Sequence, residues 1–202
     1  QLTPPPRAAQ LRARAAAEAV AIPVLPGAAV GSADAAMSVA RLIGTPLLVK
    51  AVGGGGGRGM KRIERLTELP AAISLAASEA GAAFGDARVY LERLVTRARH
   101  IEVQVLGDGA GRVIHLGERD CSVQRRYQKL IEESPAPGLP ELLCHRLHEA
   151  AVRFAERLSY RGAGTVEFLV DTEGERAGQH VFIEMNPRIQ VEHTVTEEVT
   201  DV

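Results

Sequence analysis

The sequence predicts an α+β fold in which antiparallel strand pairs are covered by helices. Two hairpins carry this prediction, over residues 99–117 and 165–185, because each joins two strand-like runs across a glycine-containing turn. Apolar residues at helical spacing over Leu139–Leu158 indicate a helix between the two hairpins. Neighbouring hairpins with flanking helices argue against a parallel βαβ sheet.

The composition supports a large buried core and excludes several functional classes. Of the 202 residues, 46% are hydrophobic, which excludes disorder for most of the chain. The 24 basic and 25 acidic side chains give a net charge of −1, so charge favours neither nucleic acid nor an anionic membrane as a partner. Cys121 and Cys144 lack metal or disulfide spacing, which favours a reduced, intracellular protein. The longest uncharged stretch, Ala19–Ala33, is too short and too rich in Pro and Gly to span a bilayer.

The N-terminal half is expected to alternate helices and strands around a glycine-rich loop. Pro23 is expected to end the first helix, and Ser32 is the expected N-cap of the second. The elements predicted here are a helix over Arg7–Ala21, a turn at Pro26-Gly27, a helix over Ser32–Ile43, a strand over Pro46–Val52, a helix over Thr67–Ala82 and a strand over Arg88–Arg93.

The C-terminal half is expected to contain the two hairpins and the long helix. Arg99–Leu106 alternates apolar and polar residues, which predicts a half-buried strand with His100, Glu102 and Gln104 on one face. Glu118–Glu133 is polar without a clear period and is expected to form a loop. The other elements are a strand over Arg112–Gly117, the helix over Leu139–Leu158, strands over Thr165–Asp171 and His180–Met185, a loop over Asn186–His193 and a short helical tail.

A glycine run is the first candidate for a functional site. Six of the 20 glycines fall between Gly53 and Gly59, and two of the three lysines, Lys50 and Lys61, lie on either side. Such a loop is either a flexible linker or a row of backbone N–H groups that can close over a phosphate. The flanking lysines favour the phosphate lid. It is not a Walker loop, because Met60 follows where that motif requires Lys, and a match of polyglycine to the dinucleotide pattern carries little information.

The second expected hairpin places three oxygen-bearing side chains on one face. Glu184 and Asn186 are two residues apart in one strand, and a turn centred near Glu175 brings Glu167 opposite Glu184. Facing carboxylates repel unless a cation lies between them, and hard oxygen ligands suit Mg²⁺ or Mn²⁺. The spacing alone also allows a second interpretation, in which both glutamates are solvated and paired with arginines.

Two further segments are dense in polar side chains. In residues 188–193, the Arg188 guanidinium can bind a planar oxyanion, and the Glu192 carboxylate can act as a base. Residues 118–129 end in Lys129, the third lysine of the chain. A solvated surface loop is the alternative interpretation of either segment.

Five strings of the sequence, taken in order, resemble the motifs of a known family. They are Lys50–Met60, Arg99–Gln104, Glu118–Arg126, Tyr160–Thr165 and Glu184–His193. These strings closely resemble biotin carboxylase, the ATP-grasp component of acetyl-CoA, propionyl-CoA, methylcrotonyl-CoA, pyruvate and urea carboxylases. The resemblance covers about residues 23–202. A carbamoyl-phosphate-synthetase-like ligase is expected to share the general layout but not the string Glu118–Arg126.

The resemblance implies an ATP-grasp fold, with a lid subdomain and part of the C-terminal ATP-grasp subdomain but without the family's N-terminal Rossmann-like domain. We therefore expect a helical lead-in over 1–45, the lid subdomain with its glycine-rich loop over 46–106, and the catalytic subdomain over 107–202, incomplete at its C-terminus. The chain begins without Met and is expected to be the middle of a longer enzyme.

The resemblance also implies an ATP-dependent ligase. In that family ATP phosphorylates bicarbonate to carboxyphosphate, and the CO2 released from it carboxylates N1 of biotin on a carrier protein. The implied cofactors are ATP and Mg²⁺ or Mn²⁺. The implied partners are a biotin carboxyl carrier protein or domain, a carboxyltransferase, bicarbonate and a second copy of the longer protein, with no nucleic acid and no membrane. A cytoplasmic location is expected, with the mitochondrial matrix left open.

Individual roles follow from the resemblance, position by position. Those for the nucleotide are Lys50 on phosphate, Gly54, Gly55, Gly56 and Gly57 as the lid, Glu92, Val95 and Leu169 at the adenine with Arg93 beside them, and His100 and Gln124 at the ribose. The implied metal ligands are Glu167, Glu184 and Asn186, and the implied bicarbonate pocket is Arg188, Gln190 and Val191. Glu192 is the implied base that deprotonates bicarbonate, with Arg188 and Lys129 as the catalytic cations.

Three positions depart from the family pattern. Gln10 stands where the family places a phosphate-binding Lys, Tyr127 stands where His is frequent, and Arg93 stands where Lys is frequent. The first departure supports an alternative function, a truncated MgATP-binding module without turnover of its own. A carbamoyl-phosphate-synthetase-like ligase is the other alternative.

Overall fold

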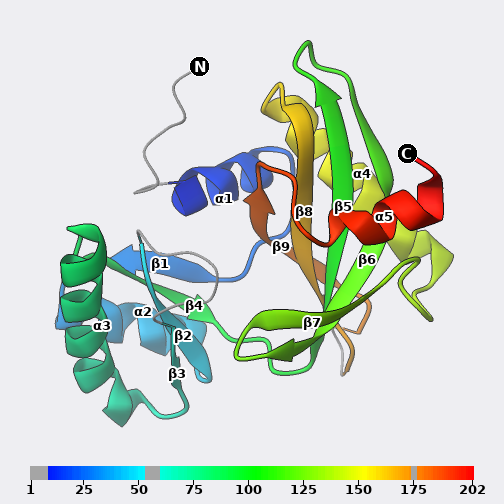
Figure 1. Ribbon diagram of the computed structural model, residues 1–202. Helices are drawn as coiled ribbons and strands as arrows, with labels where there is room; N and C mark the ends of the chain where they lie inside the picture. The colour runs from blue at the N-terminus through cyan, green and yellow to red at the C-terminus, as the bar shows by residue number, and fades with distance from the viewer. Residues whose placement is uncertain (1–8, 53–59, 174–176) are drawn as a thin grey trace. The chain divides into compact units, whose positions relative to one another are not determined.

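The structure is a computed structural model that describes residues 9–52, 60–173 and 177–202. It divides into two compact units, the first made of residues 9–12, 25–52 and 60–96, and the second of residues 13–24, 97–173 and 177–202. Each unit is an antiparallel sheet with helices, which confirms the predicted α+β class (Figure 1). The boundary between the units, at Thr96 and Arg97, differs from the division predicted at residue 106. The assignment of the three predicted segments to a lead-in, a lid subdomain and a catalytic subdomain remains a prediction.

The first unit contains a four-stranded antiparallel sheet in the order β1-β4-β2-β3. The Ser32 hydroxyl accepts a hydrogen bond from the Ala35 amide at 3.2 Å, which confirms the predicted N-cap. Leu47, Val49 and Leu91 are completely buried at the centre of the core. The elements of this unit are β1 (Gly27–Val30), α2 (Ala33–Ile43), β2 (Leu47–Ala51), β3 (Lys61–Ile63), the 3₁₀ helix η2 (Leu66–Glu68), α3 (Leu69–Phe84) and β4 (Val89–Arg93).

Strand β1 corrects the prediction of a simple turn at Pro26-Gly27. It pairs with β4, so that Gly27 faces Glu92. A Cβ atom on Gly27 would lie 2.5 Å from the Leu91 carbonyl oxygen, so the close approach of the two strands requires glycine. A four-residue strand of Gly, Ala and Val carries too little β-propensity to be found from sequence.

The second unit contains a five-stranded antiparallel sheet in the order β7-β6-β5-β8-β9. Both predicted hairpins are confirmed, because β5 pairs with β6 and β8 pairs with β9. The predicted long helix is confirmed as α4, and α1 packs its last residues into the same core. The elements are α1 (Ala9–Ala19), of which residues 13–19 belong to this unit, β5 (Ala98–Asp108), β6 (Val113–Arg125), β7 (Gln128–Glu133), α4 (Glu141–Arg157), β8 (Arg161–Asp171), β9 (His180–Asn186) and α5 (His193–Thr200).

This sheet has one apolar face and one polar face, because successive side chains of a strand point to opposite sides. Val103 on β5 and Phe168 on β8 pack with Phe154 of α4, and all three are completely buried. Glu102 and Glu167 alternate with them on the same strands and therefore point to the other face. They too are buried, at 0% and 4% exposure. The polar face is therefore buried around Glu102 and Glu167, where the sequence predicted a half-exposed face.

The segment Glu118–Glu133 corrects another prediction, because it forms the end of β6 and all of β7 where a loop was expected. Its first four residues are polar or thiol-bearing yet buried, so polarity does not mark exposure here. The turn between the strands places Arg126 and Tyr127 at φ angles of 52° and 65°. Asn and Gly are the usual signal for such a two-residue hairpin turn, and neither is present.

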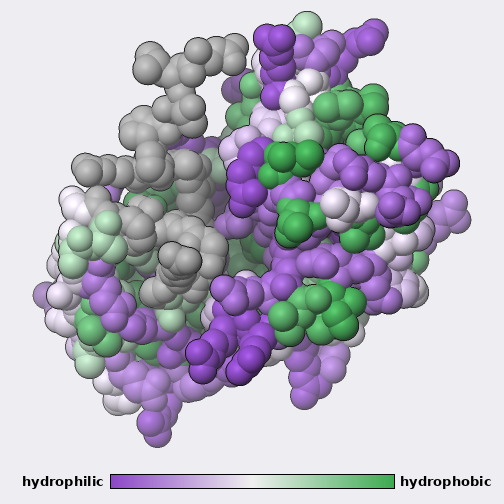
Figure 2. Space-filling view, viewed as in Figure 1, coloured by the Kyte–Doolittle hydropathy of each residue, from purple (hydrophilic) through white to green (hydrophobic). Residues whose placement is uncertain are grey.

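The edge strand β7 exposes hydrophobic side chains. Leu130 and Ile131 are 60% and 54% exposed, and Figure 2 shows a hydrophobic group over this strand. Across the described residues, the helices are all too short or too polar to cross a bilayer.

Candidate active site

Charged side chains form a row across the polar face of the five-stranded sheet. Glu102 on β5 lies opposite Arg119 on β6 and opposite Glu167 on β8. Glu167 in turn lies opposite Glu184 on β9, which confirms the pairing predicted from the hairpin spacing. Directly opposed residues point to the same face, so the row contains one guanidinium and three carboxylates.

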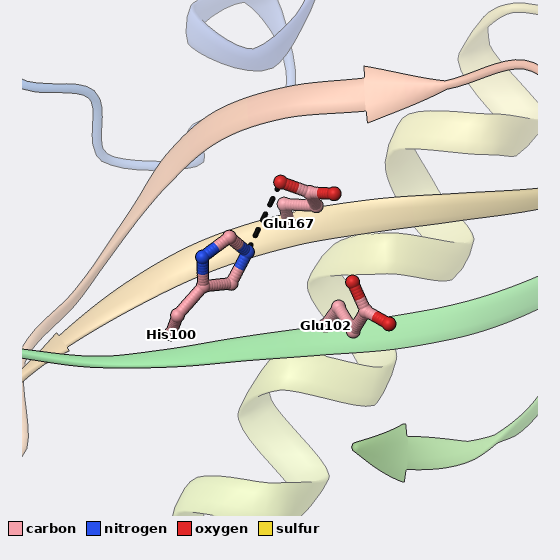
Figure 3. Close-up of side chains that lie close together, drawn as sticks. All are labelled: His100, Glu102 and Glu167. Carbon is pink, nitrogen blue, oxygen red and sulfur yellow. Dashed lines mark ion pairs between the residues drawn. The ribbon is translucent and has the colours of Figure 1, made fainter. Parts of the chain in front are cut away.

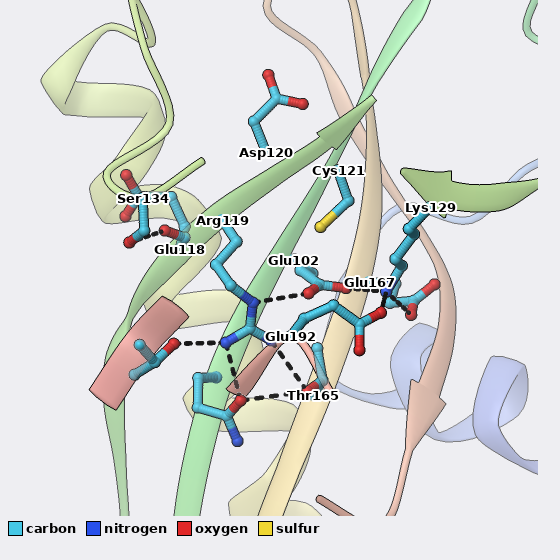
Figure 4. A network of polar contacts seen from close by, with 12 residues as sticks. Glu102, Glu118, Arg119, Asp120, Cys121, Lys129, Ser134, Thr165, Glu167 and Glu192 are labelled. Carbon is cyan, nitrogen blue, oxygen red and sulfur yellow. Dashed lines mark hydrogen bonds and ion pairs between the residues drawn. The ribbon is translucent and has the colours of Figure 1, made fainter. Parts of the chain in front are cut away.

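Lys129, on β7, brings a second positive charge to this row. Its ammonium nitrogen forms ion pairs with Glu102, with Glu167 at 3.1 Å and with Glu192 at 2.8 Å (Figure 4). An ammonium group has three N–H donors, one for each of these carboxylates. The Lys129 side chain is only 14% exposed, so the solvated-loop interpretation of this residue is wrong.

These charges shift the pKa values of their neighbours. Burial raises the pKa of Glu167, but His100 and Lys129 outweigh it and lower that pKa to about 2. Burial also raises the pKa of Glu192, and the hydrogen bond from Lys129 turns the net shift downward. For Lys129, burial lowers the pKa, whereas Glu167 and Glu102 raise it and prevail. All three groups therefore carry their charges at neutral pH.

His100 extends the cluster along β5. Its Nε2 lies 3.0 Å from Glu167 Oε2 (Figure 3), and its Nδ1 lies 2.9 Å from Gln124 Nε2. Gln124 also donates to the Cys121 carbonyl oxygen at 2.7 Å, which fixes its orientation. Leu169 is the register partner of His100. Three residues predicted to contact the nucleotide thus lie together on this face.

The same face offers ligands for a cation. Within the described part of the chain, His100, Glu102 and Glu167 form a group whose possible ligand atoms all lie within 4.8 Å of one another (Figure 3). This group includes only one of the three predicted metal ligands, Glu167. Asn186 donates from Nδ2 to Glu167 Oε1 at 2.7 Å, and Glu184 faces Glu167 on the next strand. Carboxylate and amide oxygens suit Mg²⁺ or Mn²⁺, so the residues present fit a hard divalent cation.

The segment between β9 and α5 carries the predicted bicarbonate residues. Glu192 is 8% exposed and contacts Lys129, as described above. Gln190 has a buried Oε1 that accepts no hydrogen bond from the described residues. Arg188 is exposed and donates to the carbonyl oxygen of the next residue at 3.1 Å, and Val191 is 82% exposed. The structure therefore brings Glu192 to Lys129 and leaves Arg188 and Val191 at the surface.

The predicted nucleotide residues of the first unit lie on β2 and β4. Lys50 forms an ion pair with Glu92, whose side chain is buried. Arg93, the last residue of β4, is exposed, and Val95 after it is partly exposed. The predicted lid glycines, at 54–57, and the side chain of Gln10 lie outside the described residues.

Cys121 lies within the same polar network but is chemically inert. It is completely buried, and burial followed by the charge of Glu102 raises the pKa of its thiol. A thiolate is the nucleophilic form of cysteine, so Cys121 is a packed thiol at neutral pH.

The sequence did not reveal two buried residues that lie behind the partners of Lys129. Arg119 and Thr196 are buried and hydrogen-bonded to each other, yet the spacing of residues in the sequence singled out neither of them. The alternation of apolar and polar residues along β5 placed Glu102 on the same face as His100. Alternation did not indicate that Glu102 is buried.

Comparison with known proteins places the chain in a family. Residues 10–202 match the model of the carbamoyl-phosphate synthase L chain, ATP binding domain. The chain belongs to this family.

Two curated relatives show where in that family the similarity lies. The chain is 51% identical over 183 residues to biotin carboxylase of a Nostoc species, covering 90% of this chain and 40% of that protein. It is 50% identical over 195 residues to pyruvate carboxylase 1 of Caenorhabditis elegans, covering 96% of this chain and 16% of that protein. The chain thus spans less than half the length of these relatives.

Two solved structures share the fold. The biotin carboxylase of Campylobacter jejuni, a βγ-ATP complex, has a TM-score of 0.91 and 49% identity over 96% of this chain and 43% of that one. The biotin carboxylase domain dimer of Hydrogenobacter thermophilus 2-oxoglutarate carboxylase, a complex with MgADP, ADP and bicarbonate, has a TM-score of 0.89 and 41% identity, over 97% and 43%. The predicted resemblance to biotin carboxylase and the predicted ATP-grasp fold are confirmed.

Proposed function

We propose that this chain belongs to a biotin carboxylase, which uses ATP and bicarbonate to carboxylate biotin on a carrier protein. The observation that carries the proposal is the contact of Lys129 with Glu192 and with two further buried carboxylates. In such a site an ammonium group can bind an anion while a neighbouring carboxylate accepts a proton. The identity of about one half to biotin carboxylases supports the same conclusion.

In this proposal, Glu192 and Lys129 act on bicarbonate. The Glu192 carboxylate accepts the bicarbonate proton, and a bicarbonate oxygen then bonds to the γ-phosphorus of ATP as the bond to ADP breaks. Lys129, with Arg188, offsets the negative charge of the two anions that must meet. Carboxyphosphate then separates into phosphate and CO2, and the CO2 bonds to N1 of biotin as N1 gives its proton to the released phosphate. Gln190 and Val191 complete the proposed bicarbonate pocket.

The nucleotide and the metal ion are assigned to further residues of the chain. Glu167, Glu184 and Asn186 are proposed to hold Mg²⁺ or Mn²⁺, which neutralises phosphate charge when bound. Lys50 and the lid glycines are proposed to bind phosphate. The remaining nucleotide residues are proposed to be Glu92, Arg93, Val95 and Leu169 at the adenine and His100 and Gln124 at the ribose.

The proposed partners belong to a larger biotin-dependent carboxylase. They are a biotin carboxyl carrier protein or domain, a carboxyltransferase and a second copy of the biotin carboxylase. The Hydrogenobacter relative is described as a dimer, which supports the last of these. We propose the cytoplasm or the mitochondrial matrix as the location.

Bicarbonate-dependent ATP hydrolysis by the full-length protein tests the proposal. Phosphate release should require bicarbonate and increase with biotin. Glu192→Gln should abolish this release and leave ATP binding in place, because the amide cannot accept the proton. Glu197→Gln on helix α5, at a side chain that is 49% exposed, is the matched control and should retain activity. Unchanged phosphate release by Glu192→Gln would remove Glu192 from the role of base.

Two alternatives have a specific observation in their favour. The family description names carbamoyl phosphate synthase, and such a ligase would form carbamoyl phosphate without any response to biotin. Gln10 stands where the family places a phosphate-binding Lys, which fits a MgATP-binding module without turnover. Calorimetry on the isolated chain addresses the second case. Binding of MgATP that is weakened by Glu184→Ala, without hydrolysis, would favour the module.

A further inference from the structure

Arg119 is the largest completely buried side chain among the described residues. Its guanidinium donates from Nε to Glu102 Oε1 at 2.8 Å and from Nη1 to Gln104 Oε1 at 3.0 Å and Thr196 Oγ1 at 2.5 Å (Figure 4). Nη2 lies 3.4 Å from Thr165 Oγ1. Four residues from β5, β8 and α5 therefore converge on one guanidinium.

Stability alone does not account for a guanidinium at this place. Removing an arginine and a carboxylate from water is costly, and hydrophobic residues of similar volume often stabilise a protein as well or better. Gln104, Thr165 and Thr196 bring no charge, and Glu102 is the carboxylate that pairs with Arg119 in the described structure. This pair is therefore expected to matter through the geometry that it imposes more than through its net contribution to stability.

Glu102 connects Arg119 to Lys129. One carboxylate oxygen, Oε1, accepts from Arg119, and the other, Oε2, accepts from the Lys129 ammonium. Both residues at the ends are cations, and the carboxylate between them has 0% exposure. Arg119, whose Nη1 is held by Gln104 and Thr196, therefore holds Oε1 of Glu102 in place, and with it the position of the oxygen offered to Lys129.

A second connection runs from Arg119 to the other partner of Lys129. Thr196 lies one helical turn after the start of α5, and α5 begins directly after Glu192. The Thr196 hydroxyl is 2.5 Å from Nη1 of Arg119, so this bond holds the first turn of the helix against the sheet. The helix in turn determines where the Glu192 carboxylate lies.

We propose that Arg119 is a positioning residue that sets the placement of the Lys129 ammonium relative to the Glu192 carboxylate. It reaches Lys129 through Glu102 and Glu192 through Thr196 and helix α5. Arg119 itself is buried beneath these groups and touches no substrate. This inference rests on the proposed function, in which Lys129 and Glu192 act together on bicarbonate.

The test is steady-state kinetics of bicarbonate-dependent ATP hydrolysis on the full-length protein, with rates expressed per folded molecule. Arg119→Lys keeps the charge and loses the fork. It should lower kcat by about 10- to 100-fold, since displacement of a catalytic group by about 1 Å costs up to about 100-fold. The KM for ATP should change little, because the nucleotide residues are not held by Arg119. A purely structural role would lower the yield of folded protein and leave kcat per folded molecule unchanged.

The matched control for this substitution is Arg99→Lys. Arg99 donates to Asp120 Oδ2 from Nε at 2.8 Å and from Nη2 at 2.6 Å, outside the contacts of Lys129. It makes the same chemical change to an equally well-formed arginine pair and should retain kcat. An equal loss of kcat in Arg99→Lys and Arg119→Lys would overturn the proposal.

Thr196→Val decides the question if Arg119→Lys does not fold. It removes the hydroxyl that Arg119 contacts and leaves every charge in place, so kcat should fall at least about fivefold, the factor that corresponds to the typical net contribution of one hydrogen bond. Thr200→Val, one turn further along α5, removes a hydroxyl bonded to the Thr196 carbonyl oxygen and should retain kcat. Equal kcat values for these two variants would overturn the inference. Absence of bicarbonate-dependent hydrolysis in the unmodified protein would instead refute the proposed function.

Discussion

Both faces of the five-stranded sheet contain completely buried side chains, but these side chains are held by different forces. On the apolar face, the packing of Val103, Phe168 and Phe154 is stabilised by the hydrophobic effect, which removes hydrocarbon from water and has no preferred direction. On the polar face Glu102 and Arg119, also at 0% exposure, are held by directional, charge-assisted hydrogen bonds. A truncation on the apolar face leaves a cavity, whereas a truncation on the polar face leaves an unpaired charge. The apolar face therefore stabilises the sheet, and the polar face is free to be arranged for chemistry.

The largest effect is expected from breaking the polar face at Glu102. Glu102→Ala leaves the Arg119 guanidinium without its carboxylate, and loss of one partner of a buried pair costs about 3–5 kcal/mol. Urea denaturation should show this loss as a lower free energy of unfolding. Glu64→Ala is the control, since the Glu64 pair with Arg62 is about half exposed on both sides and should contribute little. Similar stability of the two variants would mean that the Arg119 charge is solvated.

A slightly smaller loss of stability is expected on the apolar face. Leu147 of α4 is completely buried in the core, and Leu147→Ala should cost about 2–5 kcal/mol through lost burial and the cavity that remains. The comparison is sharpened by activity, because each folded molecule of Leu147→Ala should hydrolyse ATP at the normal rate. A variant that folds but hydrolyses ATP slowly would show that the two faces are coupled.

Acid should weaken the polar face before the apolar face. The pKa of Glu167 is about 2 in the folded protein, whereas the ordinary pKa of a glutamate side chain is 4.5. The folded state therefore favours the charged form. Stability from this shift is present above about pH 4.5 and is lost as the pH falls toward 2, with a slope of about 1.4 kcal/mol per pH unit for one proton. Denaturation series at several pH values should show a flatter slope in this window for Glu167→Gln. An unchanged slope would place the acid sensitivity elsewhere.

The smallest effect is expected for a lysine on the surface of the first unit. Lys61 pairs with Glu79 at 3.0 Å, and these side chains are 29% and 46% exposed. Lys61→Ala should change the free energy of unfolding by less than about 1 kcal/mol, the usual value of an exposed pair. A thermal melt of this variant compared with the unmodified protein provides the measurement. A larger loss would imply that Lys61 is held as tightly as Lys129.

Local sequence signals predicted much of the fold. The Ser32 cap, the long apolar helix α4 and the hairpin that brings Glu184 opposite Glu167 were each indicated by spacing alone. The part of β6 beyond Gly117 and all of β7 were missed, because residues 118–121 are polar or thiol-bearing yet buried and β7 is a largely exposed edge strand. The turn of Arg126 and Tyr127 also lacks the residues that usually mark a hairpin.

The candidate site was predicted less completely than the fold. Glu192 and Lys129 came from the resemblance, and the structure brings them within 2.8 Å of each other. Arg119 and Thr196 lie 77 positions apart, and their bond depends on how α5 packs on β6. No local pattern encodes such a contact, because it is made by tertiary packing between distant elements.

The most direct test of the central claim, that Lys129 is the anion-handling centre of this site, is the bicarbonate-dependent release of phosphate from ATP by the full-length protein carrying Lys129→Met. Removing one preorganised cationic or hydrogen-bonding group from such a site typically lowers the rate at least about 100-fold. We predict a loss of this size with MgATP binding retained, while Lys61→Met releases phosphate at the normal rate. Phosphate release by Lys129→Met equal to that of the unmodified protein would contradict the account.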